Sequence, residues 1–408
     1  MSSGTPSADA ARTSELPALL VLTPSADLYG SDRALLAALP ELSRRFALTV
    51  VAAVDGPMLD DARRLGAEVV VSPDWALRRR YFTPKGILPA AGRVVATLRL
   101  LRRLDRSRSF GAVYANTVAS MVLPLVPLAT RAPIVVHVRE VPRADGWMNR
   151  LYFHRLASIA SLLICNSTYT ATFAGKVAPS LRTRTRVIHN GVEPIEGGSV
   201  IRVIHDGVDR SERSRAVPDS EELQIVCVGR LHPQKGQHVM LDALRIGRER
   251  GHRWRVHFWG DALPEHADVE RSLHDQVRRD GLGDAVVWHG YSSEIDTMYA
   301  GMDVAVVPST WPEGFSLVTA EAQSAGLPAI ATGPGGPDDI IEEGVTGRIV
   351  PFSDPGAIVS ALEELGDPVV RKAWGDAARH RAKEHFCMES YAADVAQAVA
   401  SVSRARRR

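Results

Sequence analysis

Two carboxylates lie eight positions apart, Glu313 and Glu321, in the stretch WPEGFSLVTAEAQSAGLP. The strand-like segment VAVVPST ends just before it, and GFSLVTAEAQSAG opens a helix, so the first acid lies in the loop and the second in the helix. The first amides of such a helix are free to bind phosphate or sugar oxygens. They belong to Gly314, Phe315, Ser316 and Leu317. We expect Glu313 to accept hydrogen bonds from the hydroxyls of a sugar ring and Glu321 from the 2′- and 3′-hydroxyls of a ribose.

Two cations form a second group with related chemistry. Arg230 follows the strand-like segment QIVCVGR, and Lys235 comes five residues later, before the helical segment QHVMLDALRI. Two cations at the carboxyl end of a strand can neutralise a diphosphate without a metal ion. Simpler interpretations stay open: a solvated surface pair for the cations, an acid that favours the helix dipole for Glu313, and a solvent-facing helix residue for Glu321.

Short apolar strands alternate with amphipathic helices in both halves of the chain, which predicts two doubly wound parallel α/β sheets. The first half supplies ALLVLTP, FALTVVAAV, GAEVVVS, AVYAN, PIVVHV and SLLICNS, and the second supplies QIVCVGR, RVHFWGD, AVVWHGY, VAVVPST and PAIATG. In such sheets, ligands bind at the carboxyl ends of the strands. No G-x-G-x-x-G or G-x-x-x-x-G-K-[ST] motif is present, which disfavours hydride transfer and simple ATPase chemistry.

The sequence predicts four segments. They are a disordered segment 1–15, an acceptor-binding domain 16–212, a donor-binding domain 213–386 and a C-terminal helix 387–408. The stretch between the two domains contains a local echo, because RVIHNGVE at 186–193 recurs as RVIHDGVD at 202–209. One copy is expected to close the first domain, and the sequence does not decide which.

The chain has 408 residues, 45% hydrophobic and 24% charged, typical of a globular protein with two buried cores. Its three cysteines, Cys165, Cys227 and Cys387, lie far apart and lack metal-ligand spacing, so we interpret them as core residues in a reducing compartment. The apolar run LPALLVL is too short for a secretory or membrane segment, which favours a cytoplasmic protein.

The formal net charge of +2 conceals an asymmetry between the two halves. Residues 1–200 contain 25 Lys and Arg against 15 Asp and Glu, and the remainder contains 24 against 32. Part of the basic excess forms a helical pattern with Arg93, Arg99, Arg102, Arg103 and Arg106. Such a helix can lie on an anionic membrane surface. The simpler interpretation is a helix that packs on its own sheet with a solvated arginine face.

At this point the second half resembles a known family. The segments VGRLHPQKG, HGY, PSTWPEGFSLVTAEAQSAGLPAIAT and GGPDDIIEEGVTGRIVP, in this order, resemble the donor-binding half of glycosyltransferase family 4, retaining enzymes of the GT-B fold. The resemblance runs through nearly all of residues 220–365. It implies two Rossmann-like domains that face each other across a cleft, with the C-terminal helix crossing back to the first domain.

The resemblance assigns roles to individual residues. Arg230 and Lys235 would hold the diphosphate of a UDP- or GDP-linked sugar, Glu321 its ribose and Glu313 the transferred sugar, while base contacts would lie near Gly260 and Tyr291. It also implies catalysis without a metal or other cofactor, and the chain contains no D-x-D triplet.

The first half resembles the family more loosely. LYGSDRALL is similar to its glycine-containing loop after the first strand, where Gly30 would let the backbone approach the donor phosphate. HVREVPR is similar to the segment from which many members direct a catalytic-site histidine. Close relatives tend to read H-x-H-E where this chain reads HVRE, so Arg139 rather than His137 occupies the position of that histidine. Both side chains share one face of an extended segment, so either could reach the sugar.

Three functions remain open from the sequence. The favoured one is sugar transfer to a lipid-linked glycan or a similar acceptor in cell-surface polysaccharide assembly, with the protein peripheral at the inner face of the plasma membrane. The second is a soluble transferase acting on a small natural product, and the third is a non-catalytic nucleotide-sugar binder. Nucleic acid is not expected as a partner, because the basic residues lack the interleaved aromatics of a stacking groove.

Overall fold

The computed structural model describes residues 16–404 apart from the segments 28–29, 77–84, 143–145 and 196–221. The described chain divides into two compact units. The first consists of residues up to Gly191 together with those from Met388 on, and the second runs from Val192 to Cys387. The predicted boundary at residue 212 lies outside the described residues. The second copy of the echo, residues 202–209, also lies outside the described residues. The first copy, residues 186–193, begins within the last strand of the first unit.

The first unit contains a seven-stranded sheet of order β3-β2-β1-β4-β5-β6-β7, with every pairing parallel. Its central strands are apolar because they are covered on both faces; all six residues of β1, for example, are buried, whereas none of β3 or β7 is. The strands are β1 Ala18–Thr23, β2 Ala47–Ala52, β3 Glu68–Val71, β4 Ala112–Ala115, β5 Ile134–Val138, β6 Ala160–Cys165 and β7 Thr185–Val187.

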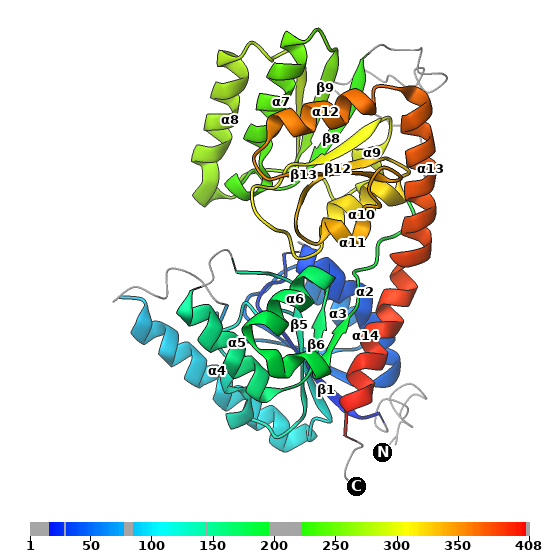
Figure 1. Cartoon of the computed structure of the whole chain (residues 1–408). Helices are drawn as coiled ribbons and strands as arrows, with labels where there is room; N and C mark the ends of the chain where they lie inside the picture. The colour runs from blue at the N-terminus through cyan, green and yellow to red at the C-terminus, as the bar shows by residue number, and fades with distance from the viewer. Residues whose placement is uncertain (1–15, 28–29, 77–84, 143–145, 196–221, 405–408) are drawn as a thin grey trace, which may run out of the picture. The chain divides into compact units, whose positions relative to one another are not determined.

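Helices cover both faces of this sheet (Figure 1). One face packs against α4 Ile87–Arg108, η2 Leu123–Leu128, α5 Trp147–Ile159, α6 Thr168–Val177 and η3 Pro179–Arg184. The other packs against α2 Gly30–Arg45, α3 Met58–Arg64 and α14 Met388–Val402. The C-terminal helix thus lies on the first unit, consistent with the predicted return of the chain, because its apolar face packs against α2 in a shared core.

The second unit contains a six-stranded parallel sheet of order β10-β9-β8-β11-β12-β13. Its strands are β8 Leu223–Val228, β9 Trp254–Trp259, β10 Val286–Gly290, β11 Val304–Val307, β12 Ala329–Gly333 and β13 Gly347–Pro351. Its helices are η5 Pro233–Lys235, α7 Gln237–Glu249, η6 Pro264–His266, α8 Ala267–Arg279, α9 Ile295–Tyr299, α10 Leu317–Ser324, α11 Pro337–Ile340, α12 Pro355–Glu364 and α13 Pro368–His385. The prediction of two doubly wound parallel sheets is therefore confirmed.

Two of the three cysteines are core residues, as predicted. Cys165 and Cys227 are buried in the sheets of the first and second unit, and Cys387 is half-buried. Within the part of the chain that the structure describes, no helix is both long enough and apolar enough to cross a bilayer.

Candidate functional site

The second sheet changes its direction of winding between β8 and β11. The chain moves from β8 to β9 and β10 on one side, and then returns to β11 and β12 on the other. The loops that follow β8 and β11 therefore diverge at the carboxyl edge of the sheet, which is where open α/β sheets bind their ligands. These two loops contain the cations and the first of the two acids singled out from the sequence.

The two loops are fastened to each other by the backbone. The amide of Thr310 donates to the carbonyl of Gln234 at 2.8 Å, and its hydroxyl donates to the carbonyl of Pro233 at 3.0 Å. Gly236 has a φ of +68°, and a Cβ on it would lie 1.9 Å from the carbonyl oxygen of Pro308. A side chain at Gly236 would therefore push the loops apart. The site is held in place before any ligand arrives.

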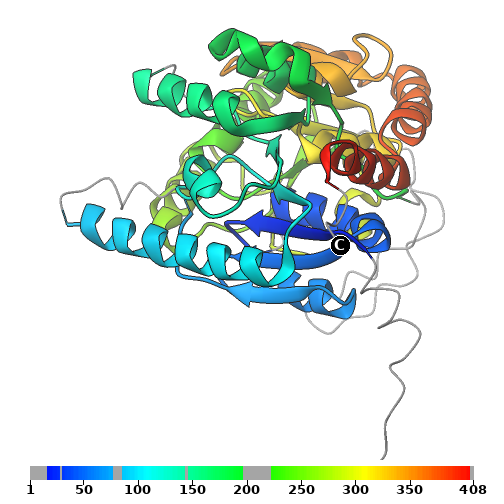
Figure 2. The same cartoon turned by 90° about the horizontal axis from the view of Figure 1, so that it is seen from below.

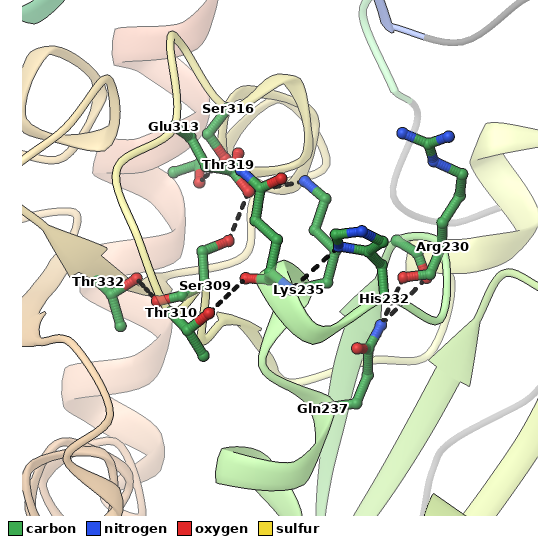
Figure 3. A network of polar contacts seen from close by, with 12 residues as sticks. Arg230, His232, Lys235, Gln237, Ser309, Thr310, Glu313, Ser316, Thr319 and Thr332 are labelled. Carbon is green, nitrogen blue, oxygen red and sulfur yellow. Dashed lines mark hydrogen bonds and ion pairs between the residues drawn. The ribbon is translucent and has the colours of Figure 1, made fainter. Parts of the chain in front are cut away.

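Lys235 and Glu313 meet between these loops (Figure 3). The Nζ of Lys235 lies 2.7 Å from Oε1 of Glu313, which also accepts a hydrogen bond from the hydroxyl of Ser309 at 2.5 Å. The side chain of Glu313 is 9% exposed and that of Lys235 is 27% exposed. The ion pair is therefore buried on the acid's side and open on the lysine's side. Arg230 extends from the same loop as Lys235 in Figure 3.

The environment of Glu313 keeps it ionised. Burial acts to raise the pKa of this carboxyl, but the charge of Lys235 and hydrogen bonds from Lys235, Ser309 and Ser316 outweigh it, so the pKa is lowered. Glu313, which is predicted to contact the sugar, thus already pairs with Lys235, which is predicted to contact the diphosphate. A donor placed here must share Lys235 with Glu313.

The start of α10 has an unusual backbone. Ser316 precedes the helix with φ +81° and ψ +78°, a left-handed conformation that is strained for a residue other than glycine. Its hydroxyl lies 2.8 Å from that of Thr319, and Phe315 beside it is buried against Phe386. Gly314 and Leu317 are half-buried. Strained residues persist where surrounding contacts fix them, and they concentrate at binding sites.

Glu321 lies inside the second unit. It is 3% exposed, and its Oε2 accepts a hydrogen bond from the hydroxyl of Tyr299 at 3.1 Å. The simpler interpretation of Glu321 as a solvent-facing helix residue is therefore wrong. A buried carboxylate with a directed donor is oriented, as a bidentate acceptor for a ribose would need to be.

Gly260 and Tyr291 lie at the carboxyl ends of the neighbouring strands β9 and β10. Gly260 has a φ of +126°, and a Cβ on it would lie 2.4 Å from the carbonyl oxygen of Gly229, so only glycine fits beside the β8 loop. Tyr291 is exposed. Like Arg230, they lie at the carboxyl edge of the second sheet, where the resemblance places the base of the donor.

In the first unit, Gly30 is the exposed first residue of α2, after β1. The candidates His137, on β5, and Arg139, directly after it, lie elsewhere than expected. His137 is fully buried, with Nδ1 2.7 Å from the hydroxyl of Tyr114, and burial followed by the charge of Arg139 holds its pKa well below the usual range. The expectation that His137 reaches a sugar directly is not met in this structure, because its ring is enclosed by the core.

Arg139 is also buried, and its guanidinium is occupied by neutral partners. Nε donates to the carbonyl of Asn116 at 2.9 Å, Nη1 to Oδ1 of Asn190 at 2.8 Å, and Nη2 to the hydroxyl of Tyr391 at 2.9 Å. Asn190 and Tyr391 lie beside the two points where the chain leaves and re-enters the first unit. The structure thus gives Arg139 a bracing position in place of the expected exposed one. Glu140, the next residue, is exposed and accepts a hydrogen bond from Thr117 at 2.6 Å.

Sequence reasoning missed several residues that complete the candidate site. Ser309 lies within the PSTWPEG segment, two residues after the end of β11, so its position near the end of a strand was a usable signal. Tyr299, Thr310 and Gly336 gave none, because their roles arise from tertiary contacts; the amide of Gly336, for example, donates to the carbonyl of Glu313 at 2.9 Å. Among the described residues, no group of three or more His, Cys, Asp or Glu is arranged to hold a metal ion.

The chain matches a known protein family over part of its length. Residues 208–381 match the family described as "Glycosyl transferases group 1". This segment contains the ion pair and both acids. The second unit therefore carries the sequence pattern of group 1 glycosyl transferases.

Individual relatives are similar over parts of the chain. The lipopolysaccharide core biosynthesis mannosyltransferase LpsB of Rhizobium meliloti is 27% identical over 235 residues, which cover 57% of this chain and 65% of that protein. The glycogen synthase of Mycobacterium tuberculosis is 25% identical over 275 residues, which cover 67% of this chain and 63% of that protein. The chain thus spans less than two thirds of the length of these relatives.

A solved structure extends the similarity to nearly the whole chain. The protein HepE of Anabaena, crystallised with UDP-glucose, superposes with a TM-score of 0.75 at 23% identity, covering 94% of this chain and 99% of that chain. At this level of identity the likeness establishes the fold. The predicted GT-B fold, with its two Rossmann-like units, is therefore confirmed.

Proposed function

We propose that the protein is a retaining glycosyltransferase that moves a hexosyl or N-acetylhexosaminyl group from a UDP- or GDP-linked sugar to a lipid-linked glycan or similar acceptor in cell-surface polysaccharide biosynthesis. The observation that carries the proposal is the Lys235–Glu313 ion pair, 2.7 Å long, at the winding switch of the second sheet. The family match over residues 208–381 and the similarity to a lipopolysaccharide mannosyltransferase support it.

In this proposal the second unit binds the donor. Arg230 and Lys235 neutralise the diphosphate, and the amides from Gly314 to Leu317 contribute donors. Glu321, oriented by Tyr299, accepts hydrogen bonds from the ribose, and Gly260 and Tyr291 border the base. Glu313 accepts hydrogen bonds from hydroxyls of the transferred sugar while Lys235 spans it and the phosphate.

The reaction needs no protein nucleophile. The bond between the anomeric carbon and the β-phosphate oxygen breaks, a bond from the same face to the acceptor hydroxyl forms, and the hydroxyl proton passes to the departing phosphate. The anomeric carbon gains positive charge and the phosphate gains negative charge on the way. Lys235 and Arg230 stabilise the phosphate, while the carboxylate of Glu313 lies on the side of the developing cation. The chain then acts by positioning and electrostatics.

The first unit would bind the acceptor. Because Arg139 and His137 are buried, we propose that they support the carboxyl edge of the first sheet, with Glu140 as the exposed group at that edge. Gly30 lies at the same carboxyl edge, after β1.

The test combines binding with turnover. A panel of nucleotide sugars is screened by thermal shift, since a ligand at a hundred times its Kd adds about 2.7 kcal/mol to stability. The best donor, labelled in the sugar, is then incubated with lipid-linked and soluble acceptors, and the anomeric configuration of the product is determined by NMR. Transfer with retention supports the proposal. Transfer only to small soluble acceptors favours the natural-product alternative, and tight donor binding without release of nucleoside diphosphate favours a non-catalytic binder.

A further inference from the structure

One side of the first unit is unusually apolar and basic at the same time. It is formed by α4, η2 and α5, which pack on the same face of the sheet through residues such as Leu101, Val126 and Phe153. Figure 2 shows η2 lying between the two helices, and both helices begin at the same end of the unit in Figures 1 and 2. We call the outward side of these three elements the α4–α5 surface.

The α4–α5 surface exposes large apolar side chains. Trp147 is 73% exposed, and Leu88 is 78% exposed. Of the thirteen large hydrophobic residues found exposed in the described part of the chain, seven belong to these three elements. They are Ile87, Leu88, Val95, Leu128, Trp147, Met148 and Leu151. Five of them lie at the starts of α4 and α5. Gathered apolar exposure of this kind marks an interaction surface rather than the scattered exposure of ordinary proteins.

The same surface is strongly basic. Arg99, Arg102, Arg103 and Arg106 are exposed along α4 and form no ion pair within the described chain. Asp105 is the single acidic residue in the sequences of α4, η2 and α5, and it accepts hydrogen bonds from Thr130 and from the amide of Phe110. The arginine side of α4 is therefore uncompensated positive charge. The simpler prediction for α4, packing on its own sheet with an arginine face outside, is confirmed, and it leaves that face to be explained.

We propose that the α4–α5 surface docks on an anionic lipid bilayer. Trp and Leu side chains at the two helix starts would enter the headgroup region, and the arginines farther along α4 would pair with lipid phosphates. Trp147 lies on α5 and the arginines lie on α4, and both helices belong to one layer. This arrangement suits a bilayer surface, where an apolar interior lies beneath anionic headgroups. This surface is distinct from the donor site in the second unit, so the inference does not rest on the proposed transfer reaction.

The test is co-sedimentation of the full chain with vesicles of phosphatidylcholine and phosphatidylglycerol, and with pure phosphatidylcholine as control. Wild type should bind only the anionic vesicles, with binding that falls as salt rises. Changing Arg99, Arg102, Arg103 and Arg106 together to Gln should lower the bound-to-free ratio about a hundredfold. Changing Trp147, Met148 and Leu151 together to Ser should lower it about tenfold or more.

A matched control removes the same charge elsewhere on the first unit. Arg44, Arg45, Arg63 and Arg64 are exposed, and three of them pair with acids one turn away. Their joint change to Gln should alter the ratio less than about twofold if location and not net charge decides binding. An equal loss in both quadruple variants would overturn the docking surface, as would tight binding to RNA that the α4 variant abolishes while vesicle binding persists.

Fluorescence quenching tests whether Trp147 enters the headgroup region or the protein only lies near the bilayer. Lipids that carry a quencher at the headgroup boundary should quench part of the tryptophan emission of wild type, and Trp147→Phe should lose that part while it still binds vesicles. Quenching that is unchanged in Trp147→Phe would show that another region touches the lipid. Donor hydrolysis in detergent-free buffer should be the same in all these variants, so failure of docking is distinguishable from failure of the proposed function.

Discussion

Arg139 in the first unit and Lys235 in the second are both cations near the carboxyl edge of a parallel sheet: Arg139 directly follows β5, and Lys235 ends η5 in the loop after β8. Their surroundings differ. Lys235 pairs with a carboxylate and is 27% exposed, whereas Arg139 is 6% exposed and donates to amide, carbonyl and phenol oxygens. A cation that is open to solvent beside an acid can exchange partners with a ligand. A cation whose donors are enclosed by neutral oxygens can only hold those groups in place.

The comparison is tested most strongly at Arg139. Changing it to Ala should lower the unfolding free energy of the first unit by about 4 kcal/mol, because Asn190, Tyr391 and the carbonyl of Asn116 lose their donor inside the core. Calorimetry, which can resolve the two units, measures the effect. Arg155→Ala, at an exposed site on α5, is the control and should cost less than about 1 kcal/mol. Normal stability with lost turnover would instead place Arg139 on the substrate.

Lys235 should respond in the opposite way. Changing it to Ala should weaken nucleoside diphosphate binding by about 2 kcal/mol, roughly thirtyfold in Kd, because a charge-assisted bond disappears and Glu313 remains buried without its cation. Adding Glu313→Ala should restore part of the affinity, since the uncompensated negative charge is then gone. Titration calorimetry on both single variants and the double variant gives the coupling energy. Strictly additive losses would mean that the pair does not act as a unit at the donor site.

The pH dependence of stability sharpens the contrast. The pKa of His137 is lowered by burial, so the unfolded chain binds more protons than the folded one below about pH 6.5. The first unit should therefore lose up to about 1.4 kcal/mol per pH unit as the pH falls below that value. His137→Gln should remove this slope. The pKa of Glu313, in the second unit, is also lowered, but from the ordinary carboxyl range. Its contribution to stability is therefore fully present above that range and is lost only at more acidic pH, as the pH falls through the folded pKa. A wild-type first unit whose stability changes with pH in the same way as that of His137→Gln would contradict the assignment.

The smallest effect is expected at Tyr299, which orients Glu321. Removing its hydroxyl in Tyr299→Phe should raise the donor KM by about fivefold, close to 1 kcal/mol, and leave kcat unchanged. Glu321→Ala should raise KM further, because it removes the ribose acceptor itself. Glu313→Ala should instead lower kcat, since Glu313 faces charge that develops in the transition state. Steady-state kinetics of the three variants separate these roles, and a fall in kcat for Tyr299→Phe would assign Tyr299 to the reacting centre.

Much of the fold could be predicted because buried parallel strands are continuous apolar runs. All eleven expected strands are present, while β7 and β13 were not predicted. β7 has three residues, none of them buried, and β13 is an edge strand that begins with a glycine and ends with a proline. Strands at a sheet edge are not buried on both faces, so their sequences need not be continuous apolar runs.

The sequence located the candidate site residues of the second unit better than those of the first. Residue type and position after a strand located Glu313, Lys235 and Arg230, but their partnership depends on which loops the winding switch brings together. At β5 the alternation of side chains placed His137 and Arg139 on one face without revealing whether that face is open. Tyr391 decides this, and it lies 252 residues beyond Arg139 in the chain.

The contact between Arg139 and Tyr391 has a consequence for the order of events during synthesis. Domains usually fold one after another as the ribosome makes them. Here the helix that covers α2 and completes the partners of Arg139 is α14, which emerges only after the whole second unit has been made. Until then the nascent first unit has an apolar face uncovered, and Arg139 has Asn116 and Asn190 as partners but lacks Tyr391. We expect chaperones to engage that face, and release of the final helix to be the step that commits the chain to its native state.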